Sequence, residues 1–259
     1  MIDNKDVVWL VLDALRYDVA KKLFEEKKLP NISKLLPTNG WQHCHSPANF
    51  TYPAHQAFFS GFLPTPIDEP KAPRLFAAEF LGSETSNEDT YIFEEANVIE
   101  SFKNNGYRTI CIGGVGFFNK QTKLSQVLPD LFDESYWKPE FSVIDKNSCC
   151  NQFNFAQTLI EQMDIEERFL LFINISAIHQ PNNFYIEGQD RDNLDSHAEA
   201  LKYVDAQLPI LFKALKNRNI FGILCSDHGT AYGEDGYWGH RNSHSTVMEV
   251  PYRDFEKQF

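Results

Sequence analysis

Apolar and polar residues follow two different patterns along the chain. Continuous apolar runs, such as those at 7–12 and 220–225, are typical of strands covered on both faces. Other segments carry apolar residues at helical spacing, as over 14–26. Strands are predicted over 7–12, 40–46, 107–112, 168–175, 220–225 and 247–250. Helices are predicted over 14–26, 30–36, 51–61, 92–105, 120–128, 151–163 and 192–216.

This alternation of strands and helices predicts an α/β fold, a three-layer α/β/α domain with a mostly parallel central sheet. Residues 64–90 are rich in Pro, Glu and Ser. They predict a surface excursion with one short helix over 75–80, beside a substrate cleft. Residues 130–142 are predicted to be irregular. No repeat or linker divides the sequence, so we expect residues 1–259 to form a single domain.

Composition narrows the classes of partner. The formal net charge of −12 argues against nucleic acid or an anionic membrane as the main partner, because both attract basic surfaces. No stretch approaches the ~20 apolar residues that span a bilayer, and the N-terminus lacks the basic region of a signal peptide. The five cysteines include no C-x-x-C pair, which favours reduced thiols. We therefore expect a cytoplasmic protein that binds neither nucleic acid nor membrane.

Acidic and imidazole side chains follow three of the predicted strands. Asp13 comes directly after the first strand, His179 shortly after the strand at 168–175, and Asp227-His228 just after 220–225. In open α/β sheets the carboxyl ends of the strands meet at one edge, where ligands bind. Each residue also has a simpler explanation, since Asp is a common helix cap and a lone His is often solvated. Their convergence at one edge favours a shared site.

Thr51 begins the predicted helix over 51–61. Pro53 suits the first helical turn and Gly61 suits the C-terminal end of this helix. A hydroxyl at a helix N-terminus faces unpaired N–H groups and the positive end of the helix dipole. This environment favours attack on an anionic phosphoryl or sulfuryl group. The alternative is that Thr51 only caps the helix.

Several other residues are left with two interpretations. Arg16 can bind an anion at the strand end or form a surface ion pair. His43 and His45 share one face of a predicted strand and can bind metal or be merely polar. His197 and Asp205, on the predicted helix over 192–216, are expected at the surface.

In their order along the chain, these residues resemble the alkaline phosphatase superfamily. The resemblance is to its sulfatase-like branch, which includes lipoteichoic acid synthase and phosphoethanolamine transferases, and it extends to Val250-Pro251. It implies an alkaline phosphatase-like fold. Asp13 resembles the first metal carboxylate of that family, and Asp227-His228 resembles its Asp-His-Gly metal pair. Thr51 falls at the position of the nucleophile, which is also a metal ligand.

The resemblance also covers three histidines. His179 lies in a segment similar to the family's His-x-Pro, whose histidine contacts the substrate or a second metal. His240 lies near the family's late basic residue, and His244 is a second candidate for that role. We expect these histidines to bind a second Zn or to position the anion. Arg241 is expected to clamp the substrate.

Two departures from the family pattern bear on the activity. Sulfatases mature a Cys or Ser to formylglycine in Cys/Ser-x-Pro-x-Arg, whereas this chain has Thr51 and, in place of the arginine, His55. Thr cannot form that group, which argues against sulfatase activity. Two-metal enzymes of the superfamily carry Asp four residues before the first His, where this chain has Ile175. One metal site is therefore expected, and a second is left open.

The resemblance implies a metal-dependent hydrolase or transferase that acts on a phosphate ester. Asp13, Thr51, Asp227 and His228 would hold a divalent ion, Zn or Mn with Mg possible. Thr51 would be the nucleophile and His179 a further catalytic residue. The expected partner is a small-molecule or peptide-linked phosphate ester. The alternatives are a sulfate-ester hydrolase, or an inactive metal-binding regulatory protein of the same fold.

Overall fold

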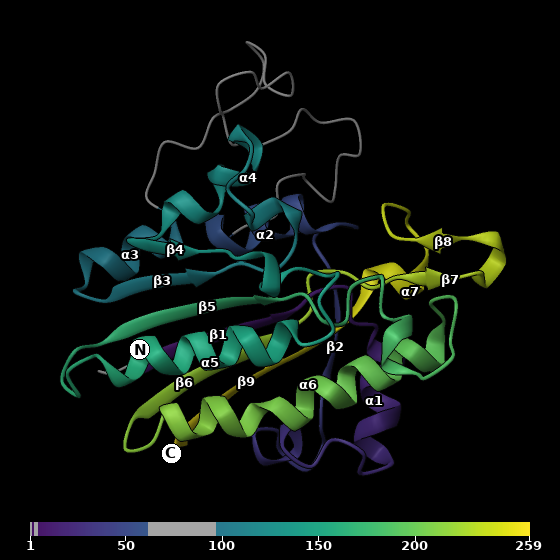
Figure 1. Cartoon of the computed structure of the whole chain (residues 1–259). Coiled ribbons are helices and arrows are strands. Elements are labelled where there is room, and N and C mark those ends of the chain that lie inside the picture. Colours follow the sequence, from purple (N-terminus) through teal and green to yellow (C-terminus); the bar gives the residue numbers. More distant parts are fainter. Residues whose placement is uncertain (1, 3–4, 62–96) are drawn as a thin grey trace.

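A computed structural model describes residues 2, 5–61 and 97–259 (Figure 1). The predictions for 64–90, including the short helix over 75–80, lie outside the described residues. The main sheet orders its strands β2-β9-β6-β1-β5-β3-β4. These strands are β1 (Asp6–Leu12), β2 (Gln42–His45), β3 (Arg108–Ile112), β4 (Glu134–Tyr136), β5 (Phe169–Ile175), β6 (Asn219–Cys225) and β9 (Glu249–Gln258).

The central part of this sheet is parallel. β1 pairs in parallel with β5 and with β6, and β3 pairs in parallel with β5 and β4. β9 lies between β6 and β2 and runs antiparallel to both. The carboxyl ends of β1, β5 and β6 therefore meet at one edge, as the sequence predicts.

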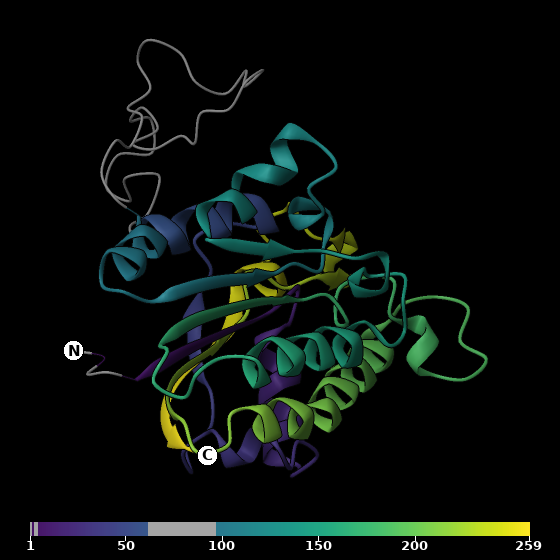
Figure 2. The ribbon, with the colours of Figure 1, turned by 60° about the vertical axis from the view of Figure 1, so that its left-hand side comes forward.

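Helices cover both faces of the sheet, as Figures 1 and 2 show. One face carries α1 (Tyr17–Glu25), α5 (Ser148–Glu161) and α6 (Leu194–Ala214), and the other carries α2 (Thr51–Ser60), α3 (Val98–Asn104) and α4 (Lys123–Val127). The short α7 (Ser245–Met248) precedes β9, and β7 (Ala231–Tyr232) pairs with β8 (Trp238–Gly239) in a small hairpin. The predicted three-layer α/β/α architecture is confirmed.

The apolar run in β1 explains the two faces. Successive side chains of a strand point in opposite directions. Val8 and Leu10 pack in the core beneath α1, α5 and α6, whereas Val7 and Trp9 pack in the core beneath α2 and α3. Every residue of β1 is buried, which requires the continuous apolar pattern seen in the sequence.

Several predicted boundaries are wrong for local reasons. The first helix begins at Tyr17 instead of residue 14, because Ala14 has φ 65°, a left-handed conformation that a right-handed helix cannot include. The last strand does not end at Pro251 but continues to Gln258 as β9. Its charged residues mask the strand pattern. β4, within the stretch predicted to be irregular, is a short edge strand.

His197 and Asp205 are buried, so the prediction of surface positions on α6 is wrong. Asp205 accepts hydrogen bonds from the backbone N–H groups of Asn31 and Ile32. His197 accepts from the backbone N–H of Arg16 and contacts the Tyr232 hydroxyl at 3.1 Å. Both side chains therefore tie α6 to neighbouring loops.

Within the described residues, we find no helix with the length and apolar character needed to cross a membrane. All five cysteines are free thiols. The cytoplasmic location and the single-domain organisation stay predictions.

Candidate active site

The carboxyl ends of β1 and β6 bring three predicted metal ligands together. Asp13, Asp227 and His228 are fully buried, and one ligand atom from each lies within 4.8 Å of the others. The parallel register, with Val11 opposite Cys225, places the two strand ends side by side. The turn at Ala14 then allows its backbone N–H to donate to Asp227 Oδ1 at 3.2 Å, which fixes this carboxylate.

Thr51 is the first residue of α2 and lies against this group. Its Oγ1 is 3.4 Å from Asp13 Oδ2 and 3.3 Å from His228 Nε2. Phe50 occupies the cap position of the helix without a side-chain hydrogen bond. The Thr51 hydroxyl therefore does not cap α2 but faces the acidic group from the N-terminal end of the helix. Gly61 ends this helix with φ 81°, as predicted.

The electrostatics of the group call for a cation. Burial and the proximity of Asp227 raise the pKa of Asp13 to about 6, and burial raises the pKa of Asp227 to about 7. Within the described part of the chain, Asp13 Oδ1 and Asp227 Oδ2 are buried without a hydrogen-bond partner. Buried carboxylate oxygens are costly unless they are hydrogen-bonded or bind a metal. These orphaned oxygens fit a divalent ion between the two strand ends.

His228 has the tautomer that a metal ligand needs. Its Nδ1 lies 2.8 Å from the Gly229 carbonyl oxygen, which can only accept, so Nδ1 carries the hydrogen. The lone pair of Nε2 therefore faces Thr51 and the two carboxylates. Burial lowers the pKa of His228 and keeps the imidazole neutral. A hydrogen bond from the ring nitrogen that does not bind the metal, like this one to Gly229, is the usual way in which proteins orient a histidine ligand.

Two residues around the group carry no ligand role in the sequence prediction. Asn174 of β5 donates from Nδ2 to Asp13 Oδ2 at 2.8 Å and accepts from the Val115 backbone N–H. The sequence signal for Asn174 is an amide residue within the otherwise apolar run Phe169–Ile175. His55 donates from Nδ1 to the Thr51 carbonyl at 2.7 Å. Burial lowers its pKa to about 3, so a neutral ring stands where sulfatases carry arginine.

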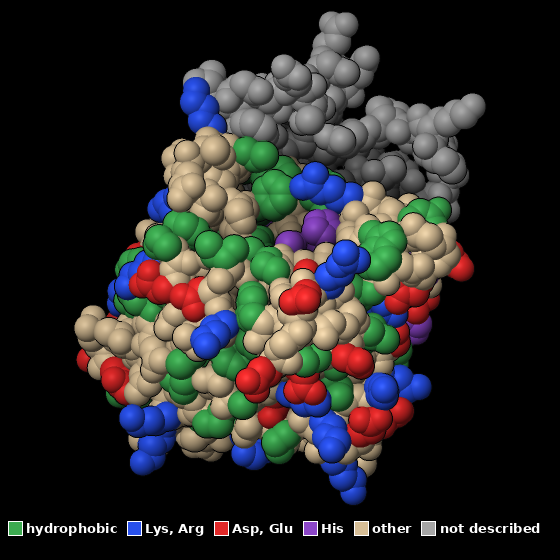
Figure 3. Space-filling model, turned by 45° about the vertical axis from the view of Figure 1, so that its right-hand side comes forward, with side chains coloured by type: hydrophobic (Ala, Val, Ile, Leu, Met, Phe, Trp, Pro, Cys, Tyr) green, Lys and Arg blue, Asp and Glu red, His purple; other side chains and the backbone are tan. Residues whose placement is uncertain are grey.

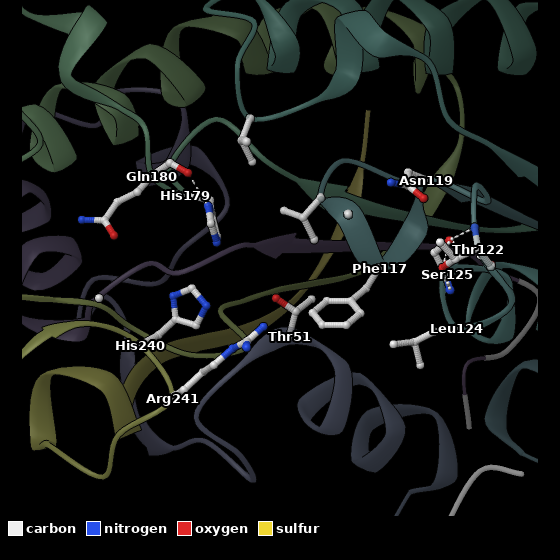
Figure 4. A pocket seen from close by; sticks show the side chains of 14 residues that line it. Thr51, Phe117, Asn119, Thr122, Leu124, Ser125, His179, Gln180, His240 and Arg241 are labelled. Atoms are coloured by element: carbon white, nitrogen blue, oxygen red, sulfur yellow. Dashed lines mark hydrogen bonds between the residues drawn. The ribbon is translucent and has the colours of Figure 1, made fainter. Parts of the chain in front are cut away.

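A pocket of about 660 Å³ opens onto Thr51. His179, His240 and Arg241 line it, and Figure 4 shows these three side chains on one side of Thr51, with Phe117 on the other. The ring centroids of His240 and His228 are 4.6 Å apart, and those of His240 and His179 are 5.2 Å apart. Burial, together with His228, lowers the pKa of His240 to about 3. Figure 3 looks into the hollow and shows histidine side chains at its floor.

The structure does not bring His244 and Arg16 into the group. His244 Nδ1 contacts Thr246, and its Nε2 lies 3.1 Å from Asp235 Oδ2. Arg16 is buried and bonds to Asp18 and Glu234. Both side chains have partners of their own, and neither lines the pocket. The surface ion pair considered for Arg16 is not what the structure shows, because the guanidinium that pairs with Asp18 and Glu234 is buried.

The remaining candidates also have structural partners. His43 stacks on Tyr17 with ring centroids 4.1 Å apart and lies 3.1 Å from Glu249. His45 contacts the Ser46 carbonyl. Ile175 is fully buried in the core beneath α5 and α6. Within the described residues, Asp13, Asp227 and His228 form the one group of acidic, histidine and cysteine side chains suited to a metal.

Comparison with known proteins decides the family. A family model described as Sulfatase matches residues 5–254. The chain belongs to the Sulfatase family. The predicted membership in the sulfatase-like branch of the alkaline phosphatase superfamily is confirmed. No curated protein matches the chain by sequence.

Solved structures share the fold of this Sulfatase-family chain at low identity. The C-terminal periplasmic domain of phosphoethanolamine transferase EptC from Campylobacter jejuni superposes with a TM-score of 0.65 at 14% identity, covering 98% of this chain and 79% of that one. A zinc complex of the corresponding domain of EcEptC from Escherichia coli gives 0.62 at 14%, covering 97% and 72%. Lipoteichoic acid synthase LtaP from Listeria monocytogenes gives 0.60 at 14%, covering 98% and 65%.

Proposed function

We propose that this Sulfatase-family chain is a metal-dependent phosphate-ester hydrolase or phosphotransferase with Thr51 as its nucleophile. One observation supports this most directly. The Thr51 hydroxyl, at the N-terminus of α2, lies within 3.4 Å of both Asp13 and His228 and lines the pocket. A nucleophile of this kind needs a group that lowers the pKa of its hydroxyl, and the surrounding carboxylates can hold one.

Asp13, Thr51, Asp227 and His228 would hold one divalent cation through three oxygens and one nitrogen. Such a set suits Zn or Mn, with Mg possible. When bound, the cation would lower the pKa of the Thr51 hydroxyl and offset negative charge on the transferring phosphoryl group. The E. coli neighbour was solved as a complex with Zn. A second ion is not part of the proposal, because His179 and His240 have no carboxylate beside them in the described pocket lining.

The other residues of the pocket support a transfer to Thr51. In the proposed step, the Thr51 hydroxyl releases its proton to water, Thr51 Oγ1 forms a bond to phosphorus, and the bond to the leaving oxygen breaks. The N–H groups at the start of α2 and the Arg241 guanidinium stabilise the phosphoryl oxygens. Water or an acceptor alcohol then takes the phosphoryl group from Thr51.

His179 is assigned to protonate the leaving oxygen. Its Nδ1 donates to the Gln180 carbonyl at 2.6 Å, so the proton for the leaving oxygen would come from Nε2 of the doubly protonated ring (Figure 4). Proton transfer by a positioned histidine typically contributes 10²–10⁴-fold to a rate. Its position in the pocket lining suits a group that contacts the substrate.

The test compares Thr51→Ala and Thr51→Ser on metal-loaded protein. Phosphomonoesters, phosphodiesters and sulfate esters are assayed together, and phosphothreonine is sought by mass spectrometry after rapid quenching. Thr51→Ala is expected to lose at least about 10³-fold in kcat/KM, whereas Thr51→Ser keeps a hydroxyl and part of the activity. Full activity in Thr51→Ala contradicts the nucleophile assignment. Turnover of sulfate esters alone favours the sulfatase alternative, and tight metal binding without any turnover favours the regulatory one.

A further inference from the structure

The two ends of the pocket differ in chemistry. One end, next to Asp13, Asp227 and His228, is lined by His179, His240 and Arg241. The opposite wall comes from the segment after β3, from α4 and from the loop before α5. Figure 4 shows Phe117 and Leu124 on this side, across the cavity from the two histidines. The apolar members of this wall are Val115, Phe117, Leu124 and Val143.

The aromatic part of the wall is fixed in place. The Phe117 ring packs against Tyr52 with centroids 5.5 Å apart and against Phe50 with centroids 6.1 Å apart. Phe50 in turn lies under the Arg241 guanidinium, 5.0 Å from its ring centroid to Cζ. Phe117, Tyr52 and Val143 pack on the buried core beneath α2 and α3. A rigid apolar surface therefore begins beside the anion-binding end and runs outward.

The polar side chains in this wall are engaged with their own backbone. Thr122 and Ser125 form the capping box that starts α4. Asn119 accepts the backbone N–H of Gln121. Across the described lining, the pocket has neither a carboxylate nor a lysine. The wall consequently offers contact area to a ligand, and few free hydrogen-bonding groups.

We propose that the ester group attached to the phosphate is uncharged and apolar, such as an aryl or compact alkyl group, and that it packs on Phe117 and Leu124. This inference rests on the proposed function, since it takes the phosphoryl group to lie beside Thr51. A cationic headgroup fits poorly, because the described pocket lining holds no carboxylate to pair with it, and Arg241 already places a positive charge in the cavity. The cavity, at about 660 Å³, is large enough for such a ligand.

The binding test uses phosphonates, which cannot be hydrolysed and therefore need no turnover. Affinities of metal-loaded protein for methylphosphonate, benzylphosphonate and 2-aminoethylphosphonate are measured by calorimetry. Burying an aromatic ring is worth enough to give benzylphosphonate an advantage of about 10- to 100-fold over methylphosphonate. 2-Aminoethylphosphonate is expected to bind no more tightly than methylphosphonate.

Two variants locate the effect. Phe117→Ala should remove most of the benzyl advantage while leaving methylphosphonate affinity unchanged, and the latter shows that the fold and the anion end are intact. Leu124→Glu supplies a carboxylate and should make 2-aminoethylphosphonate the preferred ligand. Equal affinities for benzyl- and methylphosphonate, or tighter binding of 2-aminoethylphosphonate to the unaltered chain, overturn the proposal. Neither result depends on Thr51 chemistry, and failure of the Thr51 test leaves the phosphonate preference to be judged separately.

Discussion

The two ends of β1 carry the same residue type in opposite circumstances. Asp6 begins the strand and Asp13 follows its last residue, and both are buried. Asp6 Oδ2 lies 3.0 Å from Arg218 Nη1, and its Oδ1 accepts the Phe169 backbone N–H at 3.1 Å. Asp13 has another carboxylate as its neighbour and one oxygen without a hydrogen-bond partner in the described residues. The carboxylate at one end of the strand therefore has its partners within the protein, whereas the carboxylate at the other end keeps an oxygen that the proposed cation would bind.

This difference separates a structural acid from a candidate ligand more clearly than burial alone. Burial raises the pKa of both Asp6 and Asp13, and at Asp6 the hydrogen bond from Arg218 opposes that rise. At Asp13 the neighbouring Asp227 adds to it. Folding tolerates the second arrangement only with a stabilising ligand or at a cost in stability. The Asp6 end is expected to serve stability, and the Asp13 end to serve activity at the expense of stability.

The largest effect is expected from Asp227→Asn, which should have opposite consequences for activity and stability. Asn has nearly the same shape and still accepts from Ala14 and His228, but it removes one negative charge from the group. Activity with metal should fall by about 10³-fold or more. In chelator-treated protein, by contrast, the melting temperature should rise, because the repulsion with Asp13 is lost.

The stability gained by Asp227→Asn should depend on pH, and the pKa values of the two acids give the direction of that dependence. Asp13 and Asp227 have folded-state pKa values of about 6 and about 7, above the 3.8 of an unperturbed Asp. The folded chain therefore holds more protons between pH 4 and 7, and these two acids lose their contribution to stability as pH rises through that range. Buried neutral histidines such as His55 change in the opposite direction. The melting-temperature difference between Asp227→Asn and the unaltered chain removes that background, and it should widen from pH 4 to 7. A constant difference contradicts the assignment.

A smaller effect, confined to stability, is expected from Arg218→Ala at the other end of β1. Removal of one partner of a buried ion pair leaves Asp6 uncompensated and typically costs about 3–5 kcal/mol in unfolding free energy. Urea unfolding measures this loss. Activity per folded molecule should stay unchanged, because Arg218 lies at the amino end of the sheet, away from Thr51. The double variant Asp6→Asn with Arg218→Met, which removes both charges of this buried pair, should recover part of the stability. An activity loss in Arg218→Ala would erase the contrast between the two ends.

Most of the fold follows from the sequence because buried parallel strands need continuous apolar runs. β1, β5 and β6 have them, and the apolar periodicity of α5 and α6 lies between them. β9 escapes the pattern because it carries charged residues along an outer part of the sheet. The burial of His197 and Asp205 also escapes it, because their partners are backbone groups and side chains far away in the sequence.

The candidate site, like the fold, is only partly predictable from the sequence. The sequence places Asp13, His179 and Asp227 at strand ends, and a parallel sheet gathers strand ends at one edge. Their order along the chain then identifies the family. The contacts of a side chain in a loop cannot be predicted in this way, because the sequence around a histidine in a glycine-rich loop does not indicate which groups that histidine contacts. Thus His240 lies in the pocket lining, whereas His244, four residues later, bonds to Thr246 and Asp235.

The smallest effect is expected from His244→Ala, which asks whether a histidine with partners of its own contributes to the metal site. His244 accepts the Thr246 backbone N–H at the start of the four-residue α7, and its other nitrogen meets the exposed Asp235 carboxylate. Loss of such a cap costs about 1 kcal/mol or less in unfolding free energy, and exposed ion pairs add little. Metal content by elemental analysis and kcat/KM should both stay within about twofold of the unaltered chain. A loss of bound metal would place His244 among the ligands. Buried atoms without a hydrogen-bond partner, such as Asp13 Oδ1, would then not be enough to identify the ligands of the metal.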